Sequence, residues 1–250
     1  TLPPSKLPEV GTTIFTTMSA LASEHGALNV AQGFPDLSPP ANLKEAVKRA
    51  IDEGYNQYAP MAGDLGLRAW ISEMYDQAHG AFFNADSEIT IGAGASSLLF
   101  ASIQALVFPG DEVIIVDPAY DLYAPAVHLA GGVIARAALP QPPNLGGPGG
   151  AIDPEIIRNL ISDKTKLVII NAPHNPTGAC FTAEGLNELA DVLSESNCFL
   201  FSDEVYGPMN HDGRPFLSAA GHPGLKNRTL VFVSFGKLLH ATGWKIGWVT

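Results

Sequence analysis

The sequence has few cysteines, little positive charge and no long apolar run. Its two cysteines, Cys180 and Cys198, lack the spacing of a metal site, and we expect them to be thiols with a packing role. Lysines and arginines total 14 against 25 acidic residues, and the net charge of −11 disfavours nucleic acid or an anionic membrane as a partner. No apolar run approaches the ~20 residues that a membrane helix needs, and the first residues lack the pattern of a secretion signal. We therefore expect a cytoplasmic protein that binds no metal.

Short apolar runs alternate with helical patterns along most of the chain. The runs predict strands at residues 113–116, 167–171, 198–202 and 230–234. The helical patterns lie at residues 96–107, 119–129, 154–161 and 183–196. Nearly continuous apolar runs are typical of parallel strands that are covered on both faces. The alternation therefore predicts an α/β fold with a mostly parallel central sheet between helices.

Residues 1–40 differ from the rest of the chain. They contain a proline-rich arm, a predicted helix around residues 13–24 and an extended turn at residues 32–36. Residues 41–250 are predicted to form one large domain. The segment 141–150 has the proline and glycine content of a linker, but strands and helices alternate on both sides of it. We therefore predict that this segment is a surface loop within the large domain.

Polar side chains follow three of the predicted strands. Asn175 follows one strand, Asp203 and Tyr206 follow the next, and Lys237 follows the last. Ligands of open α/β sheets bind at the carboxyl ends of the strands. The sequence therefore predicts one crevice that gathers all four side chains.

Lys237 lies on a tight turn, with the hydroxyl of Ser234 before it and the cation of Lys245 after it. A lysine that reacts with a carbonyl group must have its pKa lowered from ~10.4 by burial or by neighbouring cations. Such a run of residues suits an aldehyde ligand that also carries a phosphate. From the residues alone a simpler interpretation stays open, in which Lys237 is solvated and Asp203 with Glu204 begins a solvated turn.

A second group of residues has the pattern of an anion site. Gly94, Ala95 and Ser96 lie between the apolar residues 89–91 and the helix expected to begin near Ser96. Backbone N–H groups at a helix N-terminus bind phosphate well. Together with Ser234 and Lys245, these residues are predicted to hold a phosphate.

Three motifs, in their order and spacing, resemble the class I and II aminotransferases that depend on pyridoxal phosphate (PLP). They are Asn171-Ala172-Pro173-His174-Asn175-Pro176-Thr177-Gly178, Ser202-Asp203-Glu204-Val205-Tyr206, and Ser234-Phe235-Gly236-Lys237 with Lys245 after it. The resemblance implies a PLP-binding large domain at 41–250, preceded at 1–40 by the arm and a segment of a small domain.

The resemblance also implies roles for single residues. Lys237 would hold PLP covalently and later move a proton. Asp203 would face the pyridine nitrogen, and Asn175 and Tyr206 would donate hydrogen bonds to the ring oxygen. Tyr120 would stack on the cofactor ring.

Within that family the chain looks like the methionine and kynurenine aminotransferases, in which lysine can stand at the position of Lys245 where arginine is commoner. By this similarity Gly33 and Phe15 contact the substrate, with Phe15 in an apolar wall, and Asn175 lies near the substrate as well. Tyr58 would reach the cofactor phosphate of a neighbouring subunit, which implies a homodimer with shared sites.

The resemblance also indicates that the chain is incomplete at its C-terminus. A member of the family would continue past Thr250 with a small domain. The arginine that binds the substrate carboxylate is expected there, so we assign that role to no residue of this chain.

The predicted function is transfer of an amino group from an apolar, sulfur-containing or aromatic amino acid to a 2-oxo acid by ping-pong chemistry. A carbon–sulfur β-lyase is the alternative on the same fold, and a PLP-binding regulatory module is a third. The three histidines His174, His211 and His240 are interpreted as structural or supporting residues. Trp244 and Trp248 are predicted to pack in the core.

Overall fold

The computed structural model describes residues 3–33, 35–139, 153–209, 213 and 215–250. Within them a seven-stranded sheet has the strand order β1-β7-β6-β5-β4-β2-β3. The strands are β1 (Thr90–Gly92), β2 (Glu112–Asp117), β3 (Val133–Ala138), β4 (Thr165–Asn171), β5 (Phe199–Asp203), β6 (Thr229–Ser234) and β7 (Gly247–Val249). The five strands from β6 to β3 are parallel, whereas β7 runs antiparallel to both of its neighbours. The predicted α/β fold with a mostly parallel sheet is therefore confirmed.

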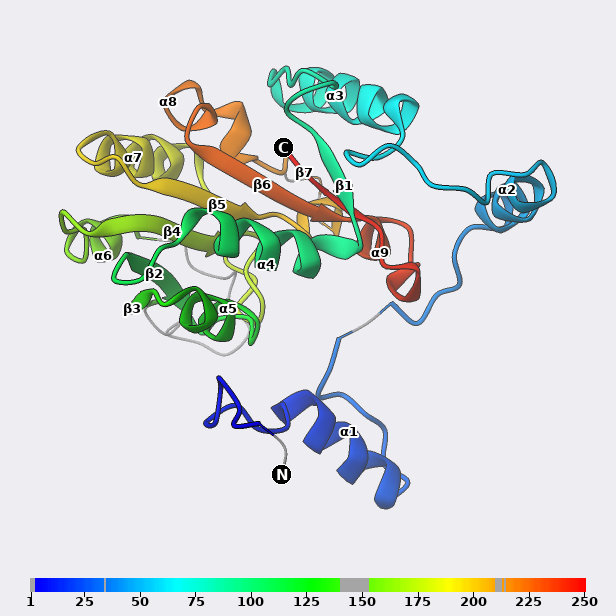
Figure 1. Cartoon of the computed structure of the whole chain (residues 1–250), viewed down its shortest axis with the longest axis horizontal. Coiled ribbons are helices and arrows are strands. Elements are labelled where there is room, and N and C mark those ends of the chain that lie inside the picture. Colours follow the sequence, from blue (N-terminus) through cyan, green and yellow to red (C-terminus); the bar gives the residue numbers. More distant parts are fainter. Residues whose placement is uncertain (1–2, 34, 140–152, 210–212, 214) are drawn as a thin grey trace.

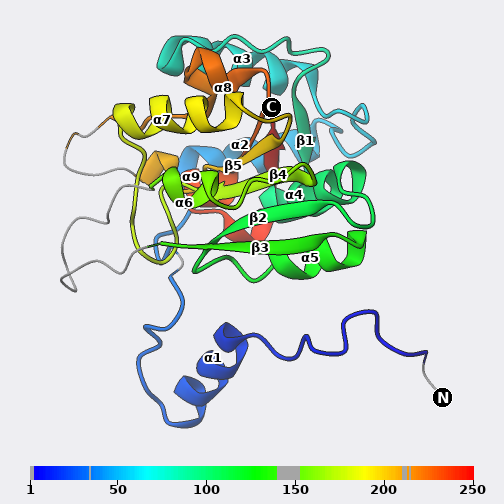
Figure 2. The same ribbon diagram turned by 90° about the vertical axis from the view of Figure 1, so that its left-hand side faces the viewer.

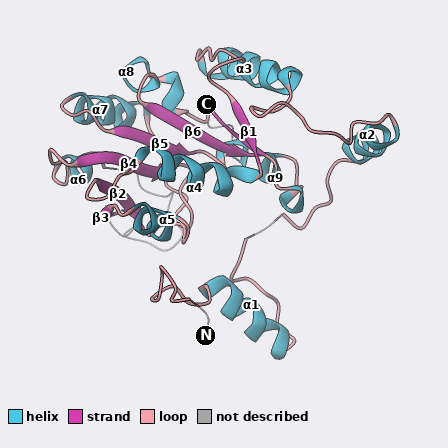
Figure 3. Cartoon of the chain, in the orientation of Figure 1, coloured by secondary structure: helices cyan, strands magenta, loops and turns pink. Residues whose placement is uncertain are grey.

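Helices cover both faces of the sheet (Figures 2 and 3). The helices of the described residues, including those away from the sheet, are α1 (Ile14–Glu24), α2 (Ala41–Asp52), α3 (Leu65–His79), α4 (Gly94–Leu106), α5 (Tyr123–Ala130), α6 (Glu155–Arg158), α7 (Ala183–Ser194), α8 (Pro223–Lys226) and α9 (Phe235–Leu238). Helices α4 and α5 pack on one face. Helices α3, α6, α7 and α8 pack on the other. Each central strand therefore buries side chains on both sides, which explains its continuous apolar sequence.

The four predicted strands are present as β2, β4, β5 and β6, and the sheet also contains β1, β3 and β7. The apolar pattern did not indicate β3. Strand β3 lies at the edge of the sheet, and its sequence, Val-Ile-Ala-Arg-Ala-Ala, is mostly only partly buried or exposed. Alanine and arginine are weak strand formers, so its pairing with β2 decides its conformation. The loop predicted at 141–150 lies outside the described residues.

Two predicted helices are shorter than expected. The helix predicted at 119–129 begins only at Tyr123, because residues 121 and 122 form a turn before it. The α-helix predicted at 154–161 covers Glu155–Arg158 only. Tyr120 therefore lies in the loop after β2 rather than at a helix start.

The N-terminal segment lies away from the sheet (Figure 1). Helix α1 begins after Thr13, whose side chain accepts a hydrogen bond from the N–H of Thr16, and it contains no buried residue. Helix α2 contains no buried residue either. No helix of the described residues is long and apolar enough to cross a membrane.

Gly247 provides a test of the contact between β7, β6 and α4. A methyl group added there would lie 2.6 Å from the carbonyl oxygen of Val233 and 2.8 Å from the amide nitrogen of Ala95. These are backbone atoms, so Gly247→Ala should lower the free energy of unfolding by about 1–3 kcal/mol, as overpacking does. Urea unfolding measures the difference.

Gly243→Ala is the matched control, because nothing lies within 4 Å of the added methyl group. Equal stability of the two variants would contradict the predicted contact.

Candidate functional site

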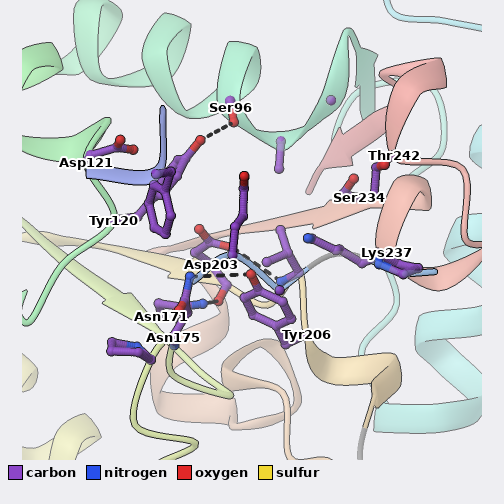
Figure 4. A pocket seen from close by; sticks show the side chains of 18 of the residues that line it. Ser96, Tyr120, Asp121, Asn171, Asn175, Asp203, Tyr206, Ser234, Lys237 and Thr242 are labelled. Carbon is purple, nitrogen blue, oxygen red and sulfur yellow. Dashed lines mark hydrogen bonds between the residues drawn. The ribbon is translucent and has the colours of Figure 1, made fainter. Parts of the chain in front are cut away.

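One cavity of about 1880 Å³ opens at the carboxyl ends of the parallel strands. Of the sequence-predicted site residues, the following line it: Phe15, Gly33, Gly94, Ala95, Ser96, Tyr120, Asn175, Asp203, Tyr206, Ser234, Lys237 and Lys245. Figure 4 shows the side chains of several of these residues turned toward one another from different loops. Tyr58 is fully exposed and does not line the cavity.

Asp203 is the last residue of β5, and its carboxylate is buried. Its Oδ2 accepts a 2.5 Å hydrogen bond from the hydroxyl of Tyr123, and its Oδ1 accepts one from the N–H of Val205 at 3.3 Å. Burial raises the pKa of Asp203 to about 6, against the opposing effect of these two hydrogen bonds. The interpretation of Asp203 as part of a solvated turn is therefore wrong.

Asn171, at the end of β4, holds the neighbouring loop in place. Its Nδ2 donates to the carbonyl oxygen of Asp203 at 2.8 Å, and its Oδ1 accepts from the N–H of Asn175 at 2.7 Å. Asn171 was not among the predicted site residues, although a polar residue at the end of an apolar strand is a signal for such a role. Asn171 thereby couples the loop that carries Asn175 to the strand that carries Asp203.

Asn175 and Tyr206 lie beside each other in the cavity (Figure 4). The Nδ2 atom of Asn175 donates to the hydroxyl of Tyr206 at 3.4 Å. The pKa of Tyr206 is raised, chiefly by burial and then by the charge of Asp203. The phenol is therefore protonated at neutral pH and is able to donate a hydrogen bond to a ligand.

Lys237 lies on the short helix α9, and its Nζ is 5.4 Å from the centre of the Tyr206 ring. Burial lowers the pKa of Lys237, and the positive charge of Lys245 lowers it further. The hydroxyl of Ser234 accepts a hydrogen bond from the N–H of Gly236 at 3.2 Å and so caps α9. The amine is therefore easier to deprotonate than that of a solvated lysine, as the sequence analysis required.

The N-terminus of α4 forms the opposite, positive side of the cavity. Ala93 precedes it and has no side chain that can cap the first N–H groups of the helix. Lys245 has a left-handed backbone with φ of 55°, and its Cα lies close to Gly94. The hydroxyls of Ser96 and Tyr120 are 3.4 Å apart at the same end. Free N–H groups, the helix dipole and a cation together favour a bound anion.

Glu204 follows Asp203 but points to the opposite face of the sheet. Its Oε1 accepts hydrogen bonds from the hydroxyl of Ser202 at 2.8 Å and from the N–H of Ala219 at 3.0 Å. Burial is the main reason why the pKa of Glu204 rises from its usual 4.5 to about 7. Glu204 is thus a buried carboxyl group outside the cavity, and the alternative interpretation, in which it begins a solvated turn with Asp203, is wrong.

The remaining sequence predictions differ in outcome. His174 is buried and shares a 2.8 Å hydrogen bond with Thr177, and His240 lines the cavity. His211 lies outside the described residues. Trp248 is buried as predicted, but the core prediction for Trp244 is wrong, because it lies in an exposed turn before β7 with 41% of its surface accessible.

The two cysteines have different surroundings. The thiol of Cys198 is buried immediately before β5, and burial raises its pKa. Cys180 is half-buried, and its Sγ lies 3.6 Å from the carbonyl oxygen of Gly178.

Comparison with known proteins gives a consistent result. The sequence model of the family "Aminotransferase class I and II" matches residues 26–250. The methionine aminotransferase of Escherichia coli K12 is 44% identical over 99% of this chain and 62% of its own length. The kynurenine–oxoglutarate transaminase of Dictyostelium discoideum is 37% identical over 99% of this chain and 60% of its own length.

A solved structure agrees with the sequence matches. The N-succinyldiaminopimelate aminotransferase of Mycobacterium tuberculosis superimposes with a TM-score of 0.92 at 37% identity, over 99% of this chain and 64% of that one. The chain thus spans about three fifths of the length of the relatives that it matches.

Glu204 makes folding depend on pH in a defined direction. Its pKa in the folded state, about 7, lies above the usual 4.5, so the folded state binds the proton more tightly than the unfolded state does. This contribution to stability is complete below pH 4.5 and is lost as pH rises through 7. Relative to Glu204→Gln, the wild type should lose about 3 kcal/mol of unfolding free energy over that range.

Urea unfolding from pH 4.5 to 8.5 measures this relative loss. Glu45→Gln is the control, because its carboxylate is largely exposed on α2. A constant difference between wild type and Glu204→Gln at every pH would exclude the predicted ionisation.

Lys245 should influence the proton affinity of Lys237. Removal of a neighbouring like charge favours the protonated amine, so Lys245→Gln should raise the pKa of Lys237. The pH dependence of Lys237 acetylation by acetic anhydride, followed by peptide mass spectrometry, gives the midpoint without any bound ligand.

Lys48→Gln, on the distant and exposed helix α2, is the control and should leave the Lys237 midpoint in place. The prediction is wrong if Lys245→Gln and Lys48→Gln give the same midpoint.

Proposed function

The chain belongs to the class I and II aminotransferase family, and from this premise we propose that the protein is a PLP-dependent aminotransferase. It transfers the amino group of an apolar, sulfur-containing or aromatic amino acid to a 2-oxo acid by ping-pong chemistry. The observation that carries the proposal is the convergence of a buried carboxylate, a lysine of lowered pKa and an uncapped helix N-terminus on one cavity.

The residues of the cavity fit PLP by the chemistry of their donors and acceptors. The N-terminus of α4, with Ser96, Ser234 and Lys245, would hold the phosphate dianion. Asp203, at the other side, would accept a hydrogen bond from the protonated ring nitrogen. Bound PLP supplies an electron sink for the negative charge that develops at the substrate Cα.

Asn175 and Tyr206 act on the ring oxygen of the cofactor. Both carry a hydrogen-bond donor, and the 3.4 Å contact between them keeps the two donors side by side. Together they favour the ionised form of that oxygen. Tyr120, whose hydroxyl is near Ser96, supplies an aromatic face for the ring.

Lys237 performs the proton transfer. Its amine must be neutral to accept the proton from the substrate Cα, and burial and Lys245 both favour the neutral amine. The amine lies 5.4 Å from the centre of the Tyr206 ring and lines the same cavity as Asp203.

The substrate is proposed to bind between the carboxyl ends of the parallel strands and the N-terminal segment. Phe15 of α1 and Gly33 line the cavity there, and an apolar wall suits methionine, aromatic amino acids or kynurenine. An apolar pocket separates such side chains by only ~1–3 kcal/mol, so we expect broad specificity.

The organisation of the whole protein is part of the proposal. Residues 1–40 would form an N-terminal arm and a segment of a small domain, and residues 41–250 would form the PLP-binding large domain. The protein would act in the cytoplasm as a homodimer. The fully exposed Tyr58 would reach the cofactor phosphate of the second subunit.

The test is the reaction of the purified protein with PLP, L-methionine and a 2-oxo acid. PLP should give an absorption band near the visible edge, L-methionine should bleach it, and a new amino acid should form from the oxo acid. Lys237→Ala removes the proton-transferring amine, so turnover should fall at least about 100-fold. Lys48→Ala, on the exposed helix α2, is the control that should retain turnover.

Two outcomes would contradict the proposal. The absence of any PLP-dependent band would exclude the cofactor. Formation of pyruvate, ammonia and a thiol from an S-substituted cysteine, with no transfer of an amino group, would mark a carbon–sulfur β-lyase instead.

A further inference from the structure

Tyr123 contacts Asp203 from outside the cavity. It is the first residue of α5, is only 2% exposed and does not line the cavity. Its hydroxyl nevertheless donates to Asp203 Oδ2 at 2.5 Å, across 80 residues of sequence. Tyr123 therefore touches the carboxylate from outside the cavity that a ligand would occupy.

The surrounding structure holds the Tyr123 ring firmly. The ring packs in the apolar cluster between α4, α5 and the sheet, which includes Leu99 and Phe201. It also meets the Tyr120 ring edge-on, with 5.7 Å between centres and 79° between planes. The position of its hydroxyl is thus decided by the core of the protein and not by side-chain motion at the cavity.

Among the groups around Asp203 in the described residues, the hydroxyl of Tyr123 is the closest hydrogen-bond donor to the carboxylate. On its own loop Asp203 accepts the longer bond from the Val205 N–H, at 3.3 Å. Two further tyrosines of the cavity, Tyr206 after β5 and Tyr120 before α5, interact electrostatically with Tyr123. Tyr206 also interacts with the charge of Asp203. Glu204 interacts with Asp203 by charge but lies on the opposite face of the sheet. Lys237 approaches from α9, on the side of the cavity.

A donor in this position has a definite electrostatic effect. Burial and the charge of Asp203 raise the pKa of Tyr123 well above its usual value, so the phenol keeps its proton and stays a donor. A hydrogen bond to a carboxylate favours the ionised form, whereas burial of Asp203 favours the neutral form. Tyr123 therefore opposes the effect of burial on Asp203.

We propose that Tyr123 is a positioning residue, whose hydroxyl keeps the Asp203 carboxylate ionised and directs it toward the cavity. The consequence for catalysis rests on the proposed function, because an ionised Asp203 is what holds the proton on the cofactor ring nitrogen. The effect on Asp203 itself does not depend on any bound ligand.

The first test is a ¹³C NMR titration of the Asp203 carboxyl carbon in the protein without PLP, assigned with Asp203→Asn. Tyr123→Phe keeps the ring in the core and removes the hydroxyl. Loss of a charge-assisted hydrogen bond should move the titration midpoint up by about 1–2 pH units. 3-Fluorotyrosine at position 123 is a stronger donor and should move the midpoint down.

Tyr75→Phe is the matched control. It also removes one buried hydroxyl, but on the other face of the sheet, in the cluster that contains Trp248. Its Asp203 midpoint should remain close to that of the wild type. An unchanged midpoint in both the phenylalanine and the fluorotyrosine variants at position 123 would overturn the proposal.

The second test adds PLP. In Tyr123→Phe the affinity for PLP should fall, and kcat should fall more than KM changes, most strongly at pH values where Asp203 has become protonated. An upward NMR shift with no PLP binding even in the wild type would refute the proposed function while supporting the role of Tyr123 toward Asp203. Normal PLP affinity and a normal pH profile in Tyr123→Phe would overturn that role in catalysis.

Discussion

The burial of the Asp203 carboxylate at the end of β5 is the constraint on which the rest of the site depends. A carboxylate removed from water is costly unless hydrogen bonds replace the water. The hydroxyl of Tyr123 and the N–H of Val205 provide these bonds, and Asn171 anchors the backbone of the same residue. The loops after β4 and β5 and the start of α5 are therefore tied together at one point.

The electrostatics of the cavity follow from this arrangement. The negative charge of Asp203 lies at the carboxyl end of the central strand β5. The positive charge of the cavity comes from Lys237, Lys245 and the N-terminus of α4. Burial lowers the pKa of Lys237, and repulsion from the charge of Lys245 lowers it further. A ligand that fits must present a proton donor to one side and an anion to the other, with a group between them that reacts with an amine.

Asp203 and Glu204 illustrate how strand alternation separates neighbouring residues. Successive side chains of a strand point to opposite faces, so Asp203 contacts α5 while Glu204 contacts Ser202 and the N–H of Ala219. Both carboxyls are buried, and their pKa values are raised for the same main reason. Asp203 faces the cavity. Glu204 instead connects β5 to the segment at Ala219 through hydrogen bonds inside the protein.

The sequence by itself determined the central strands and the polar residues at their ends. Continuous apolar runs predict parallel strands, and parallel strands end at one edge, so the meeting of Asn175, Asp203 and Lys237 was predictable. Only the tertiary structure decided the pairing of Tyr123 with Asp203, the burial of Glu204, the exposure of Trp244 and the edge strand β3. Each of these depends on contacts between residues distant in sequence. No local pattern of polar and apolar residues encodes which distant side chain will pack against a given face.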